Sequence, residues 1–355
     1  MNILIYGDNS AAGMNLIPGF EELGCSVDYI SNFDPRRDYY TSITIRSGKS
    51  KIVRRISGVV NSILLPLKLK KKYDMIIMVN PFIGPFLLSD WVFRMLKDRT
   101  ENLFWWITTC DTKMRLWSKD NNKILCQKCN LEKGTLDECP KFNEIGIEFD
   151  RRVEVYVDEV ISCTYEYAAG RVNTKKDIKI IPLSTSIYQN HSPCMEPGNV
   201  KQNKILFYHG AQSLFKGSDV IEEAFCYGEK RWSNKADFDI GSYMKLKNYI
   251  SYILNKDVIV DQLYNRSFGV NSLLIMQSGR LLLAGDTDNY EVFNSQPPAP
   301  VVRLNGKYDN LTEKIDDIMS NWNYYSEMRA EGPAYVQKYH SPLVVAQQFL
   351  EKIKS

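Results

Sequence analysis

Short apolar runs alternate with segments of helical spacing along the first half of the chain. Asn2–Tyr6 predicts a strand, Ala11–Leu23 carries apolar residues at helical spacing and predicts a helix, and Cys25–Ile30 predicts a second strand. Further strands are predicted at Met75–Val79, Leu103–Thr108, Glu159–Cys163 and Ile178–Ile181. This alternation is typical of a doubly wound α/β domain, in which ligands bind beyond the carboxyl ends of the strands.

The same alternation begins again after a polar stretch between Ser184 and Asn203, whose prolines and glycine predict a linker. The later strands are predicted at Lys204–Tyr208, Asp257–Asp261, Leu281–Ala284 and Val301–Leu304, with helices at Ser218–Tyr227 and Val270–Gln277. The tail from Leu311 to Ile353 predicts helices that are interrupted at Pro333 and Pro342.

We therefore predict an α/β protein of two Rossmann-like domains that face a cleft. The N-terminal domain covers 1–195 and carries a Cys-rich insertion at about 120–142, and the C-terminal domain covers 204–335. A last helix at 336–355 is expected to cross back to the N-terminal domain. The length of 355 residues suits two cores rather than one.

Composition narrows the location of the protein. The net charge of +3 is too small to indicate nucleic acid by itself. No secretory pattern precedes Asn2–Tyr6, and polar residues, glycine and prolines interrupt the longest apolar stretch, Met75–Phe93. We expect a cytoplasmic protein, with the eight cysteines reduced or bound to metal.

Several segments of the second half form an ordered series. The run Ile205–Asp219 contains Lys-Gly-Ser-Asp at its end, Asp257–Gln262 is an apolar strand that ends in Asp-Gln, and Ser267–Phe268–Gly269 precedes the helical stretch Leu273–Gly279. In the first half, Lys179–Leu183 is a strand that ends in Pro-Leu. This series resembles retaining glycosyltransferases of the GT-B fold, the group 1 or family 4-like enzymes.

The resemblance implies a nucleotide-sugar donor, such as a UDP-, GDP- or dTDP-sugar, bound by the C-terminal domain. The residues it assigns to the donor are His209, Gly210, Ser213, Lys216, Gly217, Ser267, Gly269 and Asn271. Lys216 lies where a helix starts, so a diphosphate would meet both its charge and free backbone N–H groups. The alternatives are a solvated lysine, a plain loop glycine at Gly269 and a structural histidine at His209.

The sequence departs from the family pattern at Leu274. Relatives carry there the glutamate that grips the ribose hydroxyls, and leucine accepts no hydrogen bond. We expect a neighbour such as Asn271 to take this role. Otherwise the chain is a non-catalytic partner subunit of GT-B shape that lacks normal nucleotide binding.

Asp111 is the candidate catalytic residue. The run Phe104–Arg115 resembles the strand and loop that carry an aspartate into the cleft of these enzymes, where it orients or deprotonates an acceptor hydroxyl. The alternative role is capping the next helical turn. The resemblance also implies that transfer retains configuration, with the leaving diphosphate accepting the acceptor's proton.

Three cysteines have metal-like spacing: Cys126, Cys129 and Cys139. Thiolates two residues apart bind one tetrahedral ion, so a structural Zn²⁺ is predicted, with Cys110, Asp137 or Glu138 as candidates for the fourth ligand. The alternative is three free thiols in a polar loop. No cofactor is expected for catalysis.

A basic cluster without any acid between Arg46 and Tyr73 predicts a membrane-facing helix. The residues expected to face an anionic membrane are Arg54, Arg55, Lys68, Lys70, Lys71 and Lys72. Aliphatic residues at helical spacing interleave them, rather than the aromatic residues that stack on bases, so we expect no nucleic-acid partner. The alternative is a helix that packs its aliphatic face on the core and exposes a basic face.

The resemblance implies a glycosyltransferase, hexosyltransferase-like, and the basic cluster predicts that it is peripheral on the inner face of the cell membrane. We expect it to move a sugar to a lipid-linked or polysaccharide acceptor in bacterial surface-glycan assembly, such as O-antigen, capsule or exopolysaccharide.

Overall fold

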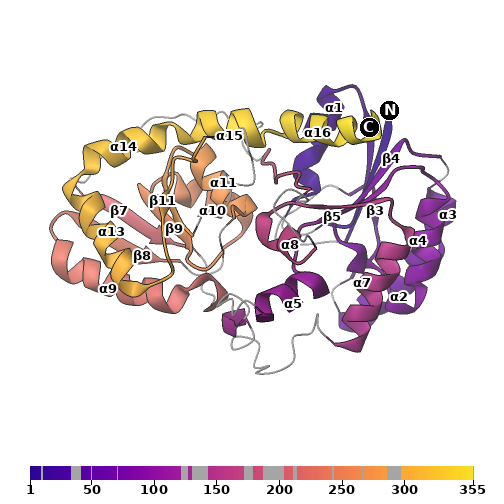
Figure 1. The fold of residues 1–355 in the computed structure, drawn as a ribbon, viewed down its shortest axis with the longest axis horizontal. Helices are drawn as coiled ribbons and strands as arrows, with labels where there is room; N and C mark the ends of the chain where they lie inside the picture. The colour runs from indigo at the N-terminus through magenta and orange to yellow at the C-terminus, as the bar shows by residue number, and fades with distance from the viewer. Residues whose placement is uncertain are drawn as a thin grey trace. The chain divides into compact units, whose positions relative to one another are not determined.

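The chain folds into two compact units, which are described separately below (Figure 1). The computed structural model describes residues 1–8, 11–32, 41–48, 50–69, 71–120, 127–129, 143–171, 179–186, 204–210, 214–241, 244–265, 267–285 and 297–354. Unit 1 comprises Met1–Trp117, Cys139–Ser186 and Ser341–Ser355, and unit 2 comprises Ser118–Glu138 and Ile187–His340.

Unit 1 is built on a sheet of six parallel strands in the order β3-β2-β1-β4-β5-β6. The strands are β1 (Asn2–Tyr6), β2 (Ser26–Ser31), β3 (Ile43–Thr44), β4 (Met75–Met78), β5 (Leu103–Ile107) and β6 (Glu159–Ser162). The central strands read as continuous apolar runs because helices cover both faces of a parallel sheet. The predicted strand at 178–181 is reduced, within the described residues, to a bridge between Ile180 and Ser162.

Most helices of unit 1 connect successive strands of this sheet, and α8 follows the last strand. They are α1 (Ile17–Glu22), α2 (Lys51–Ile63), α3 (Leu65–Lys68), α4 (Ser89–Lys97), α5 (Thr112–Asp120), α7 (Glu144–Tyr156) and α8 (Tyr165–Ala169), with short 3-10 turns η1 (Met14–Leu16), η2 (Pro81–Ile83) and η3 (Phe86–Leu88). The predicted helix at Ala11–Leu23 is thus η1 followed by α1, whose first turn contains Pro18.

The last helix, α16 (Pro342–Lys354), packs against α1 in unit 1 (Figure 1). Its buried Phe349 contacts the rings of Phe20 and Trp106. A Cβ atom on Gly19 would lie 2.0 Å from the carbonyl oxygen of Pro342, so only glycine permits this close approach. The end of the chain therefore completes the core of the unit that its beginning starts.

Unit 2 has a second parallel sheet, in the order β11-β10-β9-β7-β8. Its strands are β7 (Ile205–His209), β8 (Ala236–Ile240), β9 (Val258–Gln262), β10 (Leu281–Ala284) and β11 (Val302–Arg303). Its helices are α9 (Ser218–Trp232), α10 (Leu246–Ile253), α11 (Val270–Gln277), α13 (Tyr308–Ser320), α14 (Trp322–Ala330) and α15 (Gly332–His340), with a 3-10 turn η5 (Leu214–Lys216).

Strand β8 was not expected from the sequence. Its residues Ala-Asp-Phe-Asp-Ile carry two acids, and strand prediction relies on apolar and β-branched residues. As an edge strand it is mostly half-buried, and its acids Asp237 and Asp239 form ion pairs with Lys204 and Lys256. Two parallel sheets with alternating helices confirm the predicted α/β class. Among the described helices, none combines the length and hydropathy that crossing a bilayer requires.

Candidate functional site in the C-terminal unit

The carboxyl edge of the second sheet brings two helix starts together. Strands β7 and β9 are parallel neighbours, and the segments that leave them begin α9 at Ser218 and α11 at Val270. The first N–H groups of a helix have no partner within it and carry partial positive charge. This edge is therefore suited to an anion.

A buried carboxylate, Asp261 on β9, links these two segments. Its Oδ1 accepts hydrogen bonds from the Lys216 ammonium at 2.9 Å and from the Asn271 side-chain amide at 2.8 Å, and its Oδ2 accepts the Ser272 hydroxyl at 2.6 Å. Asn271 and Ser272 lie in the first turn of α11, and Lys216 ends η5. We call Asp261, Lys216, Asn271 and Ser272 the Asp261 cluster.

A β-bulge and the surrounding charges favour ionised Asp261. The pairing of β10 with β9 skips from Val260 to Gln262, so Asp261 is the extra residue of the bulge, a feature that re-aims a side chain. Burial by itself would raise the pKa of Asp261. The Lys216 charge and the hydrogen bonds from Ser272, Lys216 and Asn271 outweigh burial and hold this pKa below its usual value.

Lys216 is placed by the backbone on both sides of it. Its carbonyl accepts the Leu263 N–H at 2.9 Å, which ties the turn before α9 to the segment after β9. Gly217 follows with φ of 85°, and a Cβ there would lie 2.7 Å from Leu263 Cδ1, so glycine is required. About 20% of the Lys216 side-chain surface is exposed, so the side chain is restrained by Asp261 but not fully buried.

His209 is fully buried and holds β7 to its neighbours. Its Nδ1 donates to the Val260 carbonyl at 2.7 Å, and in the neutral ring its Nε2 accepts from the Ser218 hydroxyl at 2.8 Å. This geometry supports the structural alternative, because both ring nitrogens are engaged inside unit 2. Gly210 follows, between the rings of Tyr208 and Tyr249.

The predicted donor-binding residues Ser267 and Gly269, in the segment before α11, have different surroundings. Ser267 is buried, and its carbonyl accepts the Gln262 side-chain amide at 3.1 Å. A Cβ on Gly269 would meet nothing within 4 Å, so the backbone borders open space at the start of α11. Leu274 is buried, and its side chain has no hydrogen-bonding group. Ser213 lies outside the described residues.

Lys128 is a cation that the sequence gave no reason to single out. It comes from the segment Ser118–Glu138 of unit 2 and lies 2.5 Å from the Asp219 carboxylate in the first turn of α9. Its ammonium also lies 6.0 Å from the centre of the Tyr264 ring. The sequence gave no signal of this contact, because Lys128 and Asp219 are 91 positions apart.

Asp111 is anchored within unit 1. Its Oδ1 accepts the Met114 N–H at 2.7 Å, which caps α5, and its Oδ2 pairs with the Arg171 guanidinium. Its side chain is only 2% exposed. These contacts correspond to the capping role, and a base at this position would have to give up the arginine first.

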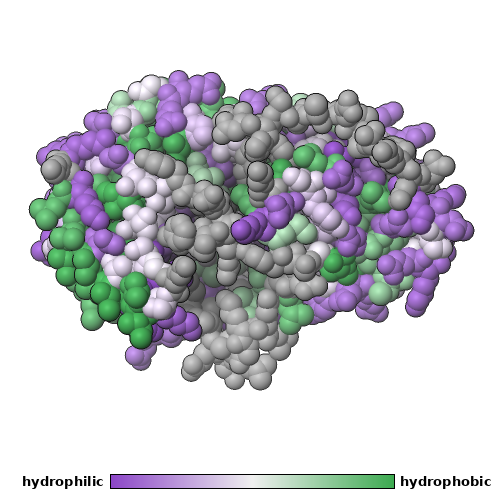
Figure 2. Space-filling model, turned by 180° about the vertical axis from the view of Figure 1, so that it is seen from behind, coloured by the Kyte–Doolittle hydropathy of each residue, from purple (hydrophilic) through white to green (hydrophobic). Residues whose placement is uncertain are grey.

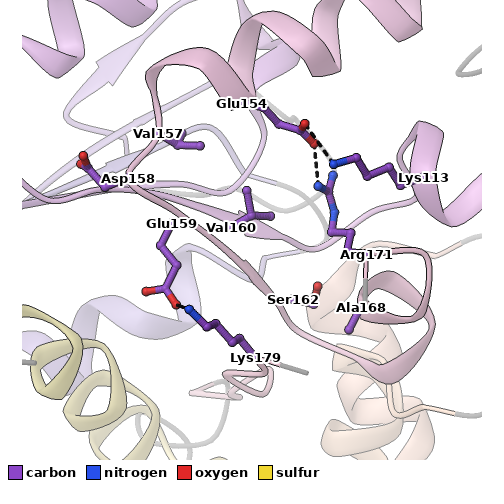
Figure 3. A pocket seen from close by; sticks show the side chains of 10 residues that line it. All are labelled: Lys113, Glu154, Val157, Asp158, Glu159, Val160, Ser162, Ala168, Arg171 and Lys179. Carbon is purple, nitrogen blue, oxygen red and sulfur yellow. Dashed lines mark hydrogen bonds and ion pairs between the residues drawn. The ribbon is translucent and has the colours of Figure 1, made fainter. Parts of the chain in front are cut away.

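Arg171 also reaches a surface pocket of about 400 Å³ in unit 1 (Figure 3). Figure 3 shows Arg171 and Lys113 both pointing at Glu154, and Lys179 pointing at Glu159. The pocket is lined by Lys113, Glu154, Val157, Asp158, Glu159, Val160, Ser162, Ala168, Arg171 and Lys179. Since most of its charges pair with one another, it offers less to an anion than the Asp261 cluster.

The predicted zinc ligands are only partly within the described structure. Cys129 carries a free, half-buried thiol, and Cys126 and Cys139 lie outside the described residues. Within the described ranges, no three potential metal ligands of the His, Cys, Asp and Glu types lie together.

Replacing Asp261 with asparagine is expected to destabilise unit 2. The variant leaves Lys216 without its anion and disturbs the bonds to α11, which should lower the free energy of unfolding by about 3 kcal/mol at neutral pH. Urea unfolding of both proteins measures this loss. Asp237→Asn is the control, because its exposed ion pair with Lys204 should contribute less than about 1 kcal/mol.

The difference in unfolding free energy between wild type and Asp261→Asn should depend on pH. The pKa of Asp261 is lowered in the folded state, so its stabilisation is complete above the unfolded pKa of about 3.9 and is lost as pH falls through the folded value. The difference between wild type and Asp261→Asn should thus stay constant from neutral pH to roughly pH 5 and shrink below pH 4. A constant difference at all pH values would contradict an ionised Asp261.

No known protein-family profile matches the chain, and no curated protein matches it by sequence. Solved structures do match across its whole length. HepE of Anabaena in complex with UDP-glucose has a TM-score of 0.63 at 11% identity, covering 100% of this chain and 99% of that one. Sucrose-phosphate synthase of Thermosynechococcus elongatus has a TM-score of 0.59 at 13% identity, covering 100% and 98%.

The fold is also similar to an enzyme of another activity. The UDP-GlcNAc 2-epimerase of Neisseria meningitidis bound to UDP-GlcNAc has a TM-score of 0.54 at 10% identity, covering 100% of both chains. At such identities the likeness concerns the fold. The chain has the GT-B fold, as its sequence pattern predicted.

Proposed function

We propose that this protein is a glycosyltransferase that takes a sugar from a nucleotide-sugar donor bound at the carboxyl edge of the second sheet. The observation that carries the proposal is the Asp261 cluster, which holds one lysine beside the start of α9 and ties it to the start of α11. Two helix starts and a mobile ammonium provide the donors and charge that a diphosphate needs. The fold likeness to structures that contain UDP and UDP-glucose supports a nucleotide ligand.

Donor binding would exchange one anion for another at Lys216. The ammonium pairs with Asp261 at 2.9 Å, and an incoming diphosphate would compete for it. The Asp261 side chain keeps its hydrogen bonds from Asn271 and Ser272 when the lysine turns away. Asp261 therefore positions the Lys216 ammonium near the donor site, and its carboxylate remains hydrogen-bonded when the lysine moves.

The ribose would be held differently from the family pattern. Leu274 is buried, and Asn271 is partly exposed in the first turn of α11. The amide nitrogen of Asn271 donates to Asp261, which leaves its amide oxygen to accept a ribose hydroxyl. Gly269 beside it adds no side chain to the open space there.

We propose that the transfer retains the anomeric configuration. The bond between the anomeric carbon and the diphosphate oxygen breaks, and the acceptor oxygen forms its bond on the same face of the sugar. The proton of the acceptor hydroxyl moves to an oxygen of the leaving diphosphate. Lys216 and the helix starts neutralise the charge that develops on that diphosphate.

The proposed acceptor is a lipid-linked or polysaccharide chain in bacterial surface-glycan assembly, reached from the cytoplasmic face of the membrane. The basic residues before Tyr73 support an anionic surface as the partner, and their aliphatic neighbours disfavour nucleic acid. We assign Asp111 to holding the loop between β5 and α5 on this acceptor side, through its cap of α5 and its ion pair with Arg171.

One feature favours a second candidate, a non-catalytic partner subunit. The position at which relatives bind ribose is occupied here by buried Leu274. If Asn271 does not replace that contact, an unmet ribose hydroxyl would weaken binding by about 1–3 kcal/mol. Nucleotide binding therefore separates the two candidates.

Lys216→Met should weaken the binding of UDP, GDP or dTDP, whichever the wild type prefers. Loss of a charge-assisted hydrogen bond to phosphate should lower affinity roughly tenfold or more, as titration calorimetry would show. Lys230→Met is the matched control, because this exposed lysine lies in the last turn of the same helix that Lys216 precedes.

Three outcomes of this titration are distinct. Weaker binding by Lys216→Met alone supports the donor site. Equal binding by both variants places the diphosphate elsewhere, and no binding of any of the three nucleotides by wild type supports the non-catalytic subunit.

Retention predicts the anomer of the product. With a donor whose sugar is α-linked, the proton NMR coupling of the transferred sugar's anomeric hydrogen should show an α-linkage. A β-linked product would rule out same-face transfer at this site, while leaving glycosyl transfer itself intact.

We also propose that Cys126, Cys129 and Cys139 hold a structural Zn²⁺. Protein from zinc-supplemented cells should contain about one zinc ion per chain after dialysis, and Cys129→Ser should lower this content. Elemental analysis measures both. Zinc-free wild-type protein that melts at an unchanged temperature after zinc addition would refute the site.

A further inference from the structure

Helix α2 turns its polar side toward unit 1. The buried or half-buried residues of this helix are Ser57, Gly58, Asn61 and Ser62. The Asn61 side-chain amide donates to the Ile45 carbonyl at 2.9 Å, and the Ser57 hydroxyl donates to the Ser47 carbonyl at 2.9 Å. Hydrogen bonds and small side chains, rather than aliphatic packing, thus attach α2 to the domain.

Gly58 allows a charged side chain to lie beneath the helix. A Cβ on Gly58 would lie 3.1 Å from Arg46 Cγ, and the Arg46 guanidinium continues to the Gly84 carbonyl at 2.7 Å. The nearest support under α2 is therefore itself polar. The aliphatic residues of α2 therefore have no apolar surface to pack against on the side that faces unit 1.

The aliphatic residues of α2 and α3 face outward. The exposed set is Ile52, Val53, Ile56, Val59, Val60, Ile63, Leu64 and Leu67, which we call the apolar face. Ile52 is 70% exposed, Ile56 59% and Leu67 68%. Figure 2 shows hydrophobic residues gathered at the lower left, where α2 lies.

This arrangement reverses that of an ordinary surface helix. At 100° per residue, Ile52, Ile56, Val59, Val60 and Ile63 share one side of α2, opposite Ser57, Gly58, Asn61 and Ser62. A globular protein normally buries the aliphatic side, so the alternative of a core-facing aliphatic face is wrong for α2. A contiguous exposed face of this kind marks an interaction surface.

We propose that the apolar face of α2 and α3 inserts into the interfacial layer of an anionic bilayer. The cations of this region select this occupant: Lys51, Arg54 and Arg55 are exposed along α2, and Lys68 is exposed at the end of α3. Aliphatic residues flanked by cations, with no acid from Arg46 to Tyr73, match acyl chains beside anionic headgroups. A second copy of the chain would instead bring these cations against one another.

The structure also sorts the cations that the sequence assigned to the membrane. Lys71 pairs with Asp28 at 3.1 Å and therefore serves unit 1. Lys72 is exposed and lines a pocket with Met1 and Lys97, at the end of the sheet where β1 begins. Lys70 lies outside the described residues. The membrane contact accordingly rests on α2 and α3, with the aliphatic residues as its larger part.

This inference deepens the proposed function by naming how the enzyme reaches a lipid-linked acceptor, but it is tested without donor or acceptor. The probe is vesicle flotation with phosphatidylcholine alone and with added phosphatidylglycerol. The paired variant Ile56→Ser with Ile63→Ser removes aliphatic surface without adding charge. Both residues are exposed, so the variant should fold, which a thermal melt verifies.

The serine pair should bind anionic vesicles about 100-fold more weakly, roughly tenfold for each inserted side chain. Arg54→Ser with Arg55→Ser should weaken binding to anionic vesicles about 25-fold, and should leave binding to neutral vesicles unchanged. Tyr324→Ser is the control, an exposed aromatic residue on α14 of unit 2 that should have no effect.

Unchanged flotation of the serine pair would overturn the proposal. So would a wild-type dimer in sedimentation that the serine pair converts to monomer, because the face would then bind a second copy. Nucleotide titration separates the membrane proposal from the proposed transferase function. Intact UDP binding with lost flotation in the serine pair supports the membrane proposal. Absent UDP binding by wild type would count only against the proposed transferase function.

Discussion

Ionised carboxylates that are buried and paired determine how the loops of both units are arranged. In unit 2, Asp261 neutralises Lys216 and accepts two hydrogen bonds from the first turn of α11. In unit 1, Asp111 neutralises Arg171 and accepts the Met114 N–H at the start of α5. A buried anion is stable only with such partners, so each one fixes a basic residue and a helix start together.

The two carboxylates differ in what they leave open. Arg171 is divided between Asp111 and Glu154, and 11% of its side chain is exposed, so the unit 1 pair is closed. Among the described residues, Lys216 forms an ion pair with Asp261 alone, and 20% of its side chain is exposed. Because a lysine ammonium turns on a flexible stem, it can change partners at low cost. That difference supports our proposals that the second unit binds the diphosphate and that Asp111 is a positioning residue.

On the surface of unit 1, helix α2 has its polar side toward the domain and its aliphatic side outward. Ser57 and Asn61 satisfy backbone carbonyls below α2, which makes the domain side of the helix polar. The aliphatic residues therefore face outward, and Ile52, Ile56 and Leu67 are more than half exposed. Such a helix gains little from packing, so its sequence makes physical sense when a lipid surface supplies the missing apolar partner.

Local pattern determined much about this protein. The apolar runs predicted most strands of both sheets, because a strand buried on both faces must be apolar throughout, and edge strand β8 escaped because its acids are solvated. Positions of Lys216, Gly217 and Asn271 at helix starts also followed from spacing.

Only the tertiary structure decided the partners of these residues. Lys216 meets an acid 45 positions away, His209 lies buried between β9 and α9, and Lys128 reaches Asp219 across 91 positions. Periodicity likewise marked α2 as amphipathic but could not tell which side faced the domain. Sequence spacing records neighbours along a helix or strand, whereas burial and ion pairing depend on which segments the fold brings together.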